Sequence, residues 1–138
     1  MQHRLEAHHV RLSAICFSPD GEVLLTGGYD SVVRAWNTET GEEIRSFSGH
    51  IGAISDLACS ADGQMFASAG DDTARLWSLS TGELLRTLTV PGASVTRVVF
   101  APNTNQLVTS DTSLTNNVRV WDLTTGNQFQ RRGGLARL

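Results

Sequence analysis

The chain repeats one short phrase three times, and this repetition limits the possible folds more than any other feature of its 138 residues. The phrase holds all three tryptophans, Trp36, Trp77 and Trp121, which are spaced 41 and 44 residues apart. A turn phrase ending in Thr-Gly follows each tryptophan: "TETGE" (38–42), "LSTGE" (79–83) and "LTTGN" (123–127). Self-similarity at a fixed period near 40 residues indicates a repeat architecture in which each unit packs against its neighbours.

The segments inside each unit favour short strands. In the first unit the runs "SAICF", "EVLLTG", "VVRAW" and "EIRSF" are rich in Val, Ile, Leu and Thr. They are separated by turns such as "SPDG", where Pro suits the second turn position and Gly the position that favours a positive φ. The run "VVRAW" is apolar on both faces, which is typical of a sheet packed between two others. Each unit of about 42 residues is therefore predicted to form four antiparallel strands.

Two further phrases recur in register: "FSPDG" (17–21) with "CSADG" (59–63), and "AHHVRL" (7–12) with "GHIGAI" (49–54). With the tryptophan phrase, they make the chain resemble the WD-repeat family of β-propellers from about Leu5 to Phe129. The resemblance implies an all-β fold of four-stranded antiparallel blades in one WD-repeat region. The expected limits are about 8–48 for blade 1, 50–90 for blade 2 and 91–132 for blade 3, with 133–138 as a non-repeat tail.

The resemblance also implies a structural tetrad of His, Ser or Thr, Asp and Trp in each blade. The matching residues are His8, Thr26, Asp30 and Trp36 in the first unit, His50, Ser68, Asp71 (or Asp72) and Trp77 in the second, and Thr109 and Trp121 in the third. The implied role is a buried hydrogen-bond network, because a buried imidazole or carboxylate needs partners.

His, Asp and a hydroxyl also invite a hydrolase interpretation. Repetition argues against it, because a catalytic set is needed once whereas a structural network serves every blade. The sequence also lacks a G-x-S-x-G motif and any metal-ligand spacing. We therefore expect no catalytic residue, no metal and no cofactor, and an enzyme remains the less favoured alternative.

The third unit departs from the pattern. Pro91 stands where the histidine is expected, and "APNT" lacks the turn glycine. The hairpin 110–121 is about three residues longer than its counterparts, which places Thr115 at the aspartate position and leaves Asp111 as a substitute. We expect blade 3 to be the least stable and its hairpin mobile. An equally open alternative is that the longer loop recognises a partner.

The favoured function is a non-catalytic scaffold that binds proteins through one rim of the propeller. By resemblance, the rim positions are His9, Arg11, Tyr29, Ile51, Ala53, Gly70 (or Asp71), Gly92, Ser94 and Leu114. Tyr29 stands out, because exposed Tyr is a residue type common in binding hot spots. The net charge of -3 disfavours nucleic acid as a partner. The sequence shows no signal peptide and no membrane-spanning run, so a cytoplasmic or nuclear location is expected.

Three blades cannot close a ring, since propellers have four to eight. Apolar side chains of residues 32–36 or 117–121 are therefore expected to be poorly buried on the outward sides. The sequence favours a piece of a larger propeller over a homodimeric six-bladed ring, and both remain open. Arg132 and Leu135 break the repeat pattern near the end of the chain.

The two cysteines, Cys16 and Cys59, fall one residue out of register between units. Side chains alternate along a strand, so the thiols are predicted to face different sides of their blades. We expect them to be free and far apart.

Overall fold

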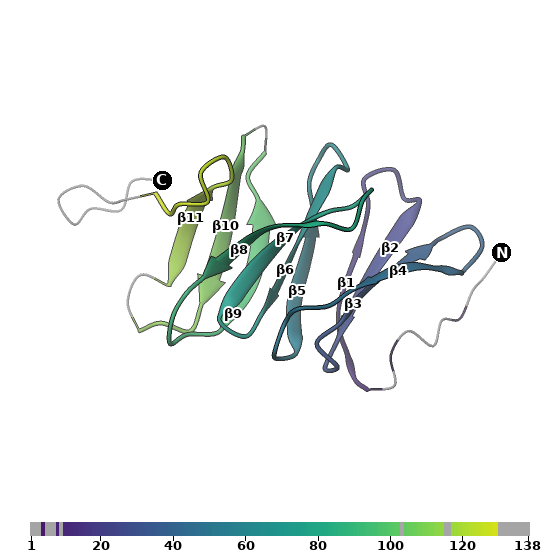
Figure 1. Ribbon diagram of the computed structural model, residues 1–138, viewed down its shortest axis with the longest axis horizontal. Helices are drawn as coiled ribbons and strands as arrows, with labels where there is room; N and C mark the ends of the chain where they lie inside the picture. Colours follow the sequence, from purple (N-terminus) through teal and green to yellow (C-terminus); the bar gives the residue numbers. More distant parts are fainter. Residues whose placement is uncertain (1–3, 5–7, 9, 103, 115–116, 130–138) are drawn as a thin grey trace.

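The protein is described by a computed structural model that covers residues 4, 8, 10–102, 104–114 and 117–129. Within these residues, eleven strands form three antiparallel sheets that stand side by side (Figure 1). The first sheet, blade 1, consists of β1 (Leu12–Phe17), β2 (Val23–Gly28), β3 (Val33–Asn37) and β4 (Glu43–Phe47). The strands pair in sequence order, as expected for hairpins joined by short turns.

Blade 2 repeats this arrangement, and blade 3 repeats its first three strands. Blade 2 consists of β5 (Ile54–Cys59), β6 (Met65–Gly70), β7 (Thr73–Ser78) and β8 (Leu84–Thr89). Blade 3 consists of β9 (Val95–Phe100), β10 (Gln106–Asp111) and β11 (Val118–Asp122), and Trp121 forms one further bridge with Gln128. The predicted all-β class and antiparallel blades are confirmed, with four strands in blades 1 and 2. The fourth strand predicted for blade 3 is represented among the described residues only by the Trp121–Gln128 bridge. The end of blade 3 at 132, the tail 133–138, Arg132 and Leu135 lie outside the described residues, and the blade limits stay a prediction.

The recurring "S-x-D-G" turns explain where the first strand of a blade ends. The Ser18 hydroxyl donates to Asp20 Oδ1 at 2.7 Å and accepts from the Val23 amide at 3.0 Å. Gly21 then takes a φ of 75°, a conformation that glycine adopts without strain. Ser60 and Asp62 make the same contact at 2.7 Å in blade 2. Local chemistry thus determines these turns, which is why they can be predicted from sequence.

The apolar core lies between blades. One cluster joins Leu25, Val33 and Phe47 of blade 1 to Leu57 and Trp77 of blade 2, all of them buried. A second cluster joins blades 2 and 3, and its buried members include Leu76, Leu88, Val98, Leu107 and Trp121. Neither core belongs to a single sheet, so each blade depends on its neighbour for burial.

Serine hydroxyls tie neighbouring inner strands together. Ser55 Oγ lies 3.1 Å from the Ala69 carbonyl of its own blade and 2.8 Å from the Val95 carbonyl of the next blade, so its single proton is shared between the two carbonyls. Ser13, at the equivalent bulge of blade 1, bonds the Gly27 and Ile54 carbonyls in the same way. These repeated bonds satisfy strand carbonyls that lie within a junction between blades.

Arginines on the outer strands bind the Thr-Gly turn of the following blade. Arg45 Nη2 donates to the Ser80 carbonyl at 3.2 Å, and Arg86 Nε donates to the Leu123 carbonyl at 3.2 Å. A Cβ at Gly126 would lie 2.7 Å from Arg86 Nη1, so the guanidinium would have to shift if glycine were replaced. Gly82 has φ 81° and approaches Arg45 in the same manner. The turn glycines therefore serve both the turn and the contact between blades.

This double role gives a prediction for Gly82→Ala, with Gly92→Ala as its matched control. Gly92 has φ 77° and no atom near an added Cβ, so its substitution reports left-handed strain alone, about 1–2 kcal/mol. Gly82→Ala should cost about 1 kcal/mol more, because Arg45 must move and lose its carbonyl partner. Urea unfolding of both variants measures the difference. Equal losses would show that the arginine contact contributes nothing.

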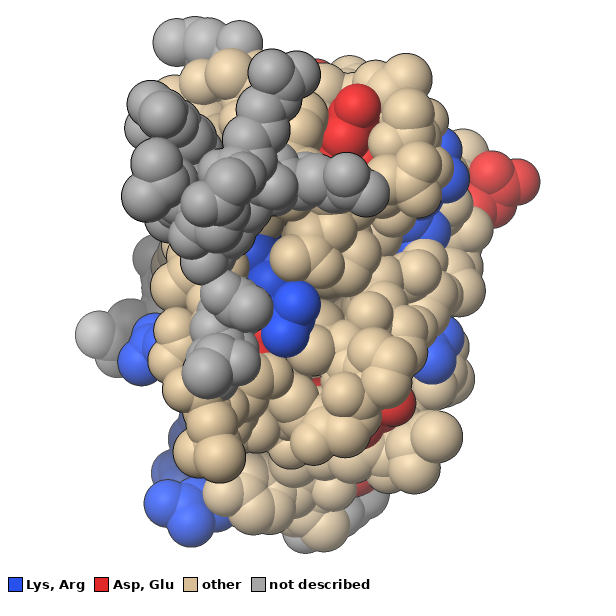
Figure 2. All heavy atoms as spheres, turned by 90° about the vertical axis from the view of Figure 1, so that its left-hand side faces the viewer, with Lys and Arg blue, Asp and Glu red and all other residues tan. Residues whose placement is uncertain are grey.

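Both end blades have an open apolar side. Ile15 of β1 is 61% exposed, whereas the residues at the same repeat position, Leu57 and Val98, are 5% and 2% exposed. On the other end, Val118 is 45% exposed, whereas its equivalent Val33 is completely buried. Figure 2 faces this side of blade 3, where uncharged residues make up most of the visible surface outside the grey atoms.

The sequence predicts poorly buried apolar side chains at residues 32–36 or 117–121. The prediction holds for 117–121 at Val118, but it is wrong for 32–36. Val33 and Ala35 are buried because they belong to the junction with blade 2. Trp36 is buried as well, with its indole bonded to Thr26. The exposed apolar residues of blade 1 instead lie on β1: Leu12, Ile15 and Phe17.

Candidate functional site

In blade 1 the four tetrad residues form a continuous hydrogen-bonded chain. Trp36 Nε1 donates to Thr26 Oγ1 at 2.9 Å, and Thr26 Oγ1 lies 2.9 Å from His8 Nε2. His8 Nδ1 lies 2.8 Å from Asp30 Oδ2. Burial would raise the pKa of Asp30, but hydrogen bonds from His8 and the Val32 amide lower it overall. The chain connects β2, β3, their hairpin and the segment that precedes β1.

Blade 2 holds the same residues in a looser arrangement. Ser68 Oγ lies 2.7 Å from His50 Nε2 and accepts from Trp77 Nε1 at 2.9 Å. His50 Nδ1 is 3.6 Å from Asp71, beyond hydrogen-bond reach. Asp71 accepts instead from the Ile51 amide at 2.6 Å and from the Thr73 hydroxyl at 2.8 Å. The segment from Ser68 to Trp77 is one residue shorter than its blade 1 counterpart, and Asp71 takes a φ of 47° in the tighter hairpin.

His50 gives a pH prediction. Burial lowers the pKa of His50 below its ordinary value. Because the pKa of His50 is lowered in the folded state, the unfolded chain binds more protons at this residue. The contribution of His50 to the free energy of unfolding is therefore complete above the unfolded pKa of about 6.5, and it is lost as the pH falls below that value. The free energy of unfolding should therefore decrease as the pH falls below about 6.5. His50→Gln should flatten this slope in denaturant titrations, and an unchanged slope would exclude His50 as its source.

Blade 3 replaces the imidazole with a guanidinium. Trp121 Nε1 still donates to Thr109 Oγ1 at 3.0 Å, but Asp111 accepts from Arg119 Nε at 2.8 Å. Burial acts to raise the pKa of Asp111, yet the hydrogen bonds from Ser113 and Arg119 lower it. Pro91 is exposed, and Thr115 lies outside the described residues. Sequence reasoning missed Arg119, although an arginine precedes each tryptophan by two positions.

The geometry of these sets suits a structural role. The side chains of His8 and His50 are each 1% exposed, so neither imidazole is open to a substrate. Over the described parts of the chain, no three His, Cys, Asp or Glu residues come together as a metal site. The same residues include no helix long and apolar enough to cross a membrane.

The predicted rim positions gather at one edge of the blades, the lower edge in Figure 1, where the β2–β3, β4–β5 and β10–β11 connections lie. Tyr29, Ile51 and Leu114 are 54%, 86% and 101% exposed. The Arg11 guanidinium lies 5.6 Å from the centre of the Tyr29 ring, a cation–π contact.

The other rim positions differ in exposure. Gly92 and Ser94 are exposed, and Ala53 is half-buried. Gly70 is buried against the Ala53 carbonyl and the His50 ring, so its prediction as an exposed rim position is wrong. His9 lies outside the described residues.

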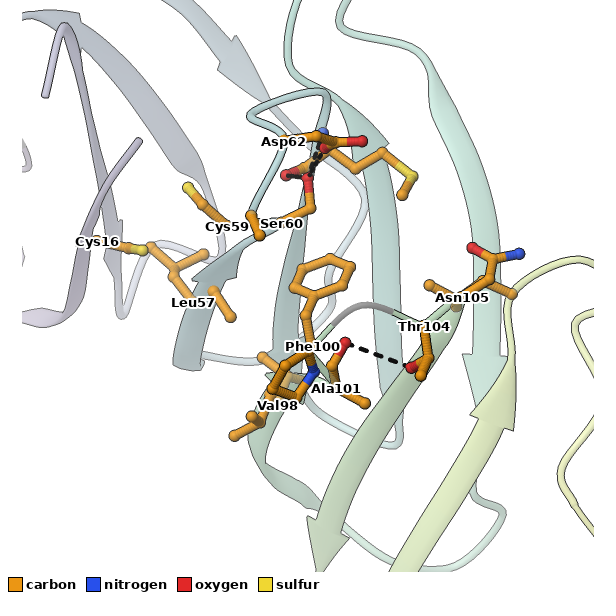
Figure 3. Close-up of a pocket in the computed structure, with 16 residues that line it drawn as sticks. Cys16, Leu57, Cys59, Ser60, Asp62, Val98, Phe100, Ala101, Thr104 and Asn105 are labelled. Carbon is orange, nitrogen blue, oxygen red and sulfur yellow. Dashed lines mark hydrogen bonds between the residues drawn. The ribbon is translucent and has the colours of Figure 1, made fainter. Parts of the chain in front are cut away.

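A pocket of about 740 Å³ opens at the opposite edge, near the β5–β6 and β9–β10 turns. Cys16, Cys59, Met65 and Phe100 contribute to its lining. Cys16 and Cys59 are free, as predicted, but they point toward one another from β1 and β5 (Figure 3). The prediction of separated thiols is wrong because one side of a blade packs against the opposite side of the next blade. Residues on the two sides of a strand differ by one position in the repeat, so residues one position out of register can meet across a junction.

Comparison with known proteins agrees with this geometry. The WD domain, G-beta repeat family matches residues 1–37, 41–78 and 82–122. The chain belongs to the WD-repeat family. It is 35% identical over 105 residues to eukaryotic translation initiation factor 3 subunit I of Aspergillus terreus, covering 75% of the chain and 31% of that protein. The Brugia malayi subunit I is 30% identical over 129 residues, covering 91% and 39%. The chain thus spans about a third of the length of these relatives.

Solved structures show the same fold. The structure of U3-55K superposes with a TM-score of 0.82 at 21% identity, covering 91% of the chain and 40% of that protein. The crystal structure of the RRP9 WD40 repeats gives the same TM-score and identity. At this identity the likeness extends to the fold of the blades.

Proposed function

We propose that this WD-repeat chain is part of a non-catalytic scaffold that binds other proteins through the rim formed by Tyr29, Ile51 and Leu114. The observation that carries the proposal is that the β2–β3, β4–β5 and β10–β11 connections, which lie at one edge of the blades, each hold a strongly exposed large apolar side chain. Scattered exposed hydrophobics are common, but a set aligned along one edge is typical of an interaction site.

The rim residues stand on supported backbone. The Ile51 amide donates to Asp71, and the Ser31 hydroxyl of blade 1 donates to the Ile51 carbonyl at 3.1 Å. The Arg11 guanidinium lies over the Tyr29 ring in a cation–π contact. A preorganised surface loses little conformational entropy on binding, which favours affinity.

The open sides of blades 1 and 3 support a second part of the proposal. In the longer relatives, the matched region is about a third of the protein, so further blades could cover both sides. A homodimeric six-bladed ring is the alternative way to cover them. Light scattering of the purified chain distinguishes the two, because only the alternative gives a discrete dimer mass. A cytoplasmic or nuclear location belongs to the same proposal, supported by relatives named as subunits of a translation initiation factor.

A site-specific photo-crosslinker tests the rim. The crosslinker is placed at Tyr29, Ile51 or Leu114, and in a control at Asp62, an exposed turn residue on the opposite edge. We expect crosslinking in host cells to recover the same protein from the rim positions and not from the control. The proposal fails if rim and control give the same products.

Alanine substitution at Tyr29 is the quantitative test of the same rim. A hot-spot side chain of this type contributes at least about 2 kcal/mol, so the affinity for the crosslinked protein should fall by more than about tenfold. Thr40→Ala, at an exposed position of a Thr-Gly turn, is the control and should leave the affinity unchanged. An unchanged affinity in Tyr29→Ala would remove Tyr29 from the interface.

A further inference from the structure

We infer that Cys16 and Cys59 form a redox-active dithiol across the junction of blades 1 and 2, which a hydroperoxide converts to a reversible disulfide. The two thiols come from different blades, point toward one another and line the same open pocket (Figure 3). Both side chains are partly buried, and both pack against the cluster that joins the two blades.

The surroundings make the two thiols unequal. The neighbouring Cys59 thiol is the main cause that lowers the pKa of Cys16 to about 7. The neighbouring Cys16 thiol, together with burial, raises the pKa of Cys59. Because thiolates and not thiols are nucleophiles, Cys16 is the attacking residue and Cys59 is the resolving residue.

The reaction balances without any group beyond the hydroperoxide. The Cys16 thiolate attacks the terminal peroxide oxygen, the O–O bond breaks, and the departing oxygen takes a proton and leaves as alcohol or water. Cys16 is then a sulfenic acid. The Cys59 sulfur attacks the Cys16 sulfur, the S–O bond breaks, and the hydroxide takes the Cys59 proton and leaves as water. Both sulfurs are oxidised, the peroxide is reduced, and an external thiol reverses the bond by exchange.

The position of the pair determines what the bond changes. A Cys16–Cys59 disulfide would link β1 to β5, two inner strands held otherwise by the Ser13 bond and by apolar packing. Crosslinking two elements restricts the unfolded chain and stabilises their junction. Since the pocket lies opposite the rim, oxidation would fix the relative placement of two blades without covering the proposed rim.

The test oxidises the purified 138-residue chain with hydrogen peroxide and maps peptides without reduction. We expect a peptide that joins Cys16 to Cys59, with the loss of two hydrogen atoms, and its disappearance after a reducing thiol. In Cys59→Ser, a dione probe should trap sulfenic acid at Cys16. In Cys16→Ser, labelling at Cys59 should be weaker than labelling at Cys16 in Cys59→Ser, because burial still raises the pKa of Cys59 when Cys16 is absent.

A second measurement does not depend on the folding of the variants. Equilibration of the wild-type chain with a glutathione redox buffer measures the effective concentration of the Cys16 thiol at Cys59. We expect this effective concentration to be at least about tenfold higher in the native chain than in the chain unfolded by guanidinium. Circular dichroism of the same native sample verifies that it is folded. Equal values in the two conditions, or disulfides only between chains, would overturn the inference. These outcomes are independent of the rim experiments.

Discussion

Replacing Trp77 with alanine will lower the free energy of unfolding by about 3–5 kcal/mol, more than the same change at Trp36 or Trp121. Trp77 is 4% exposed and stacks on Phe66 with ring centres 6.1 Å apart. It also meets Phe47 of blade 1 edge to face at 5.4 Å. The substitution therefore opens a cavity in the junction of two blades and leaves the Ser68 hydroxyl without its indole donor.

The two other tryptophans are the internal controls. The Trp36 indole also donates to a hydroxyl, that of Thr26, but Trp36 belongs to neither junction cluster. Trp36→Ala should therefore lower the free energy of unfolding by less than Trp77→Ala. Trp121 lies within the junction of blades 2 and 3 and should fall between them. Denaturant unfolding followed by circular dichroism ranks the three variants. If Trp36→Ala proves the most destabilising, the junctions are not the main source of stability.

The strands and turns could be predicted because their causes are local. The "S-x-D-G" turn requires only that Ser18 and Asp20 bond nearby amides and that Gly21 take a positive φ. Alternating apolar residues between such turns then form hairpins, whichever sheet lies alongside. The tetrad positions in blade 1 were available by resemblance. Their spacing along the hairpin places Thr26 opposite Arg34, diagonally across from Trp36, so the Trp36 indole reaches the Thr26 hydroxyl on the same face.

Contacts between blades could not be predicted, because they depend on which sides of two sheets meet. The Ser55 bond to the Val95 carbonyl and the Arg45 bond to the Ser80 carbonyl each join residues 35–40 positions apart. The meeting of Cys16 and Cys59 was mispredicted on the same ground. The alternation of side chains along a strand predicts the side of the sheet on which a residue lies. It does not predict which side of the adjacent blade packs against that sheet.

Insertions were the other limit. The longer third hairpin moves the aspartate position, and Asp111 pairs with Arg119 where a histidine would otherwise be its partner. One deletion has a comparable effect in blade 2, where Asp71 turns from His50 to the Ile51 amide. Spacing alone therefore identifies the hydroxyl and the tryptophan of each tetrad more reliably than its acidic residue.

The second prediction with a large effect concerns the open side of blade 1. It compares the same substitution at one repeat position in two blades, Ile15 in blade 1 and Leu57 in blade 2. Leu57→Asp should lower the free energy of unfolding by at least about 4 kcal/mol, because it places an unpaired carboxylate in the junction and removes a buried side chain. Ile15→Asp makes the equivalent change where the side chain is 61% exposed, and should alter the free energy by less than about 1 kcal/mol. Urea unfolding at low protein concentration measures both.

Self-association of the chain should respond to Ile15→Asp, although the stability of the isolated chain should change little. Exposed apolar strands promote pairing with other chains, so Ile15→Asp should reduce the light-scattering mass and the binding of an apolar dye. If the chain closes into a six-bladed dimer, Ile15 meets a second copy, and Ile15→Asp should destabilise as severely as Leu57→Asp while releasing monomers. If further blades cover this side in a longer protein, the isolated variant keeps its stability and becomes more soluble. Equal stability of Leu57→Asp and wild type would contradict the placement of β5 within a junction, since a carboxylate is tolerated there only in contact with water.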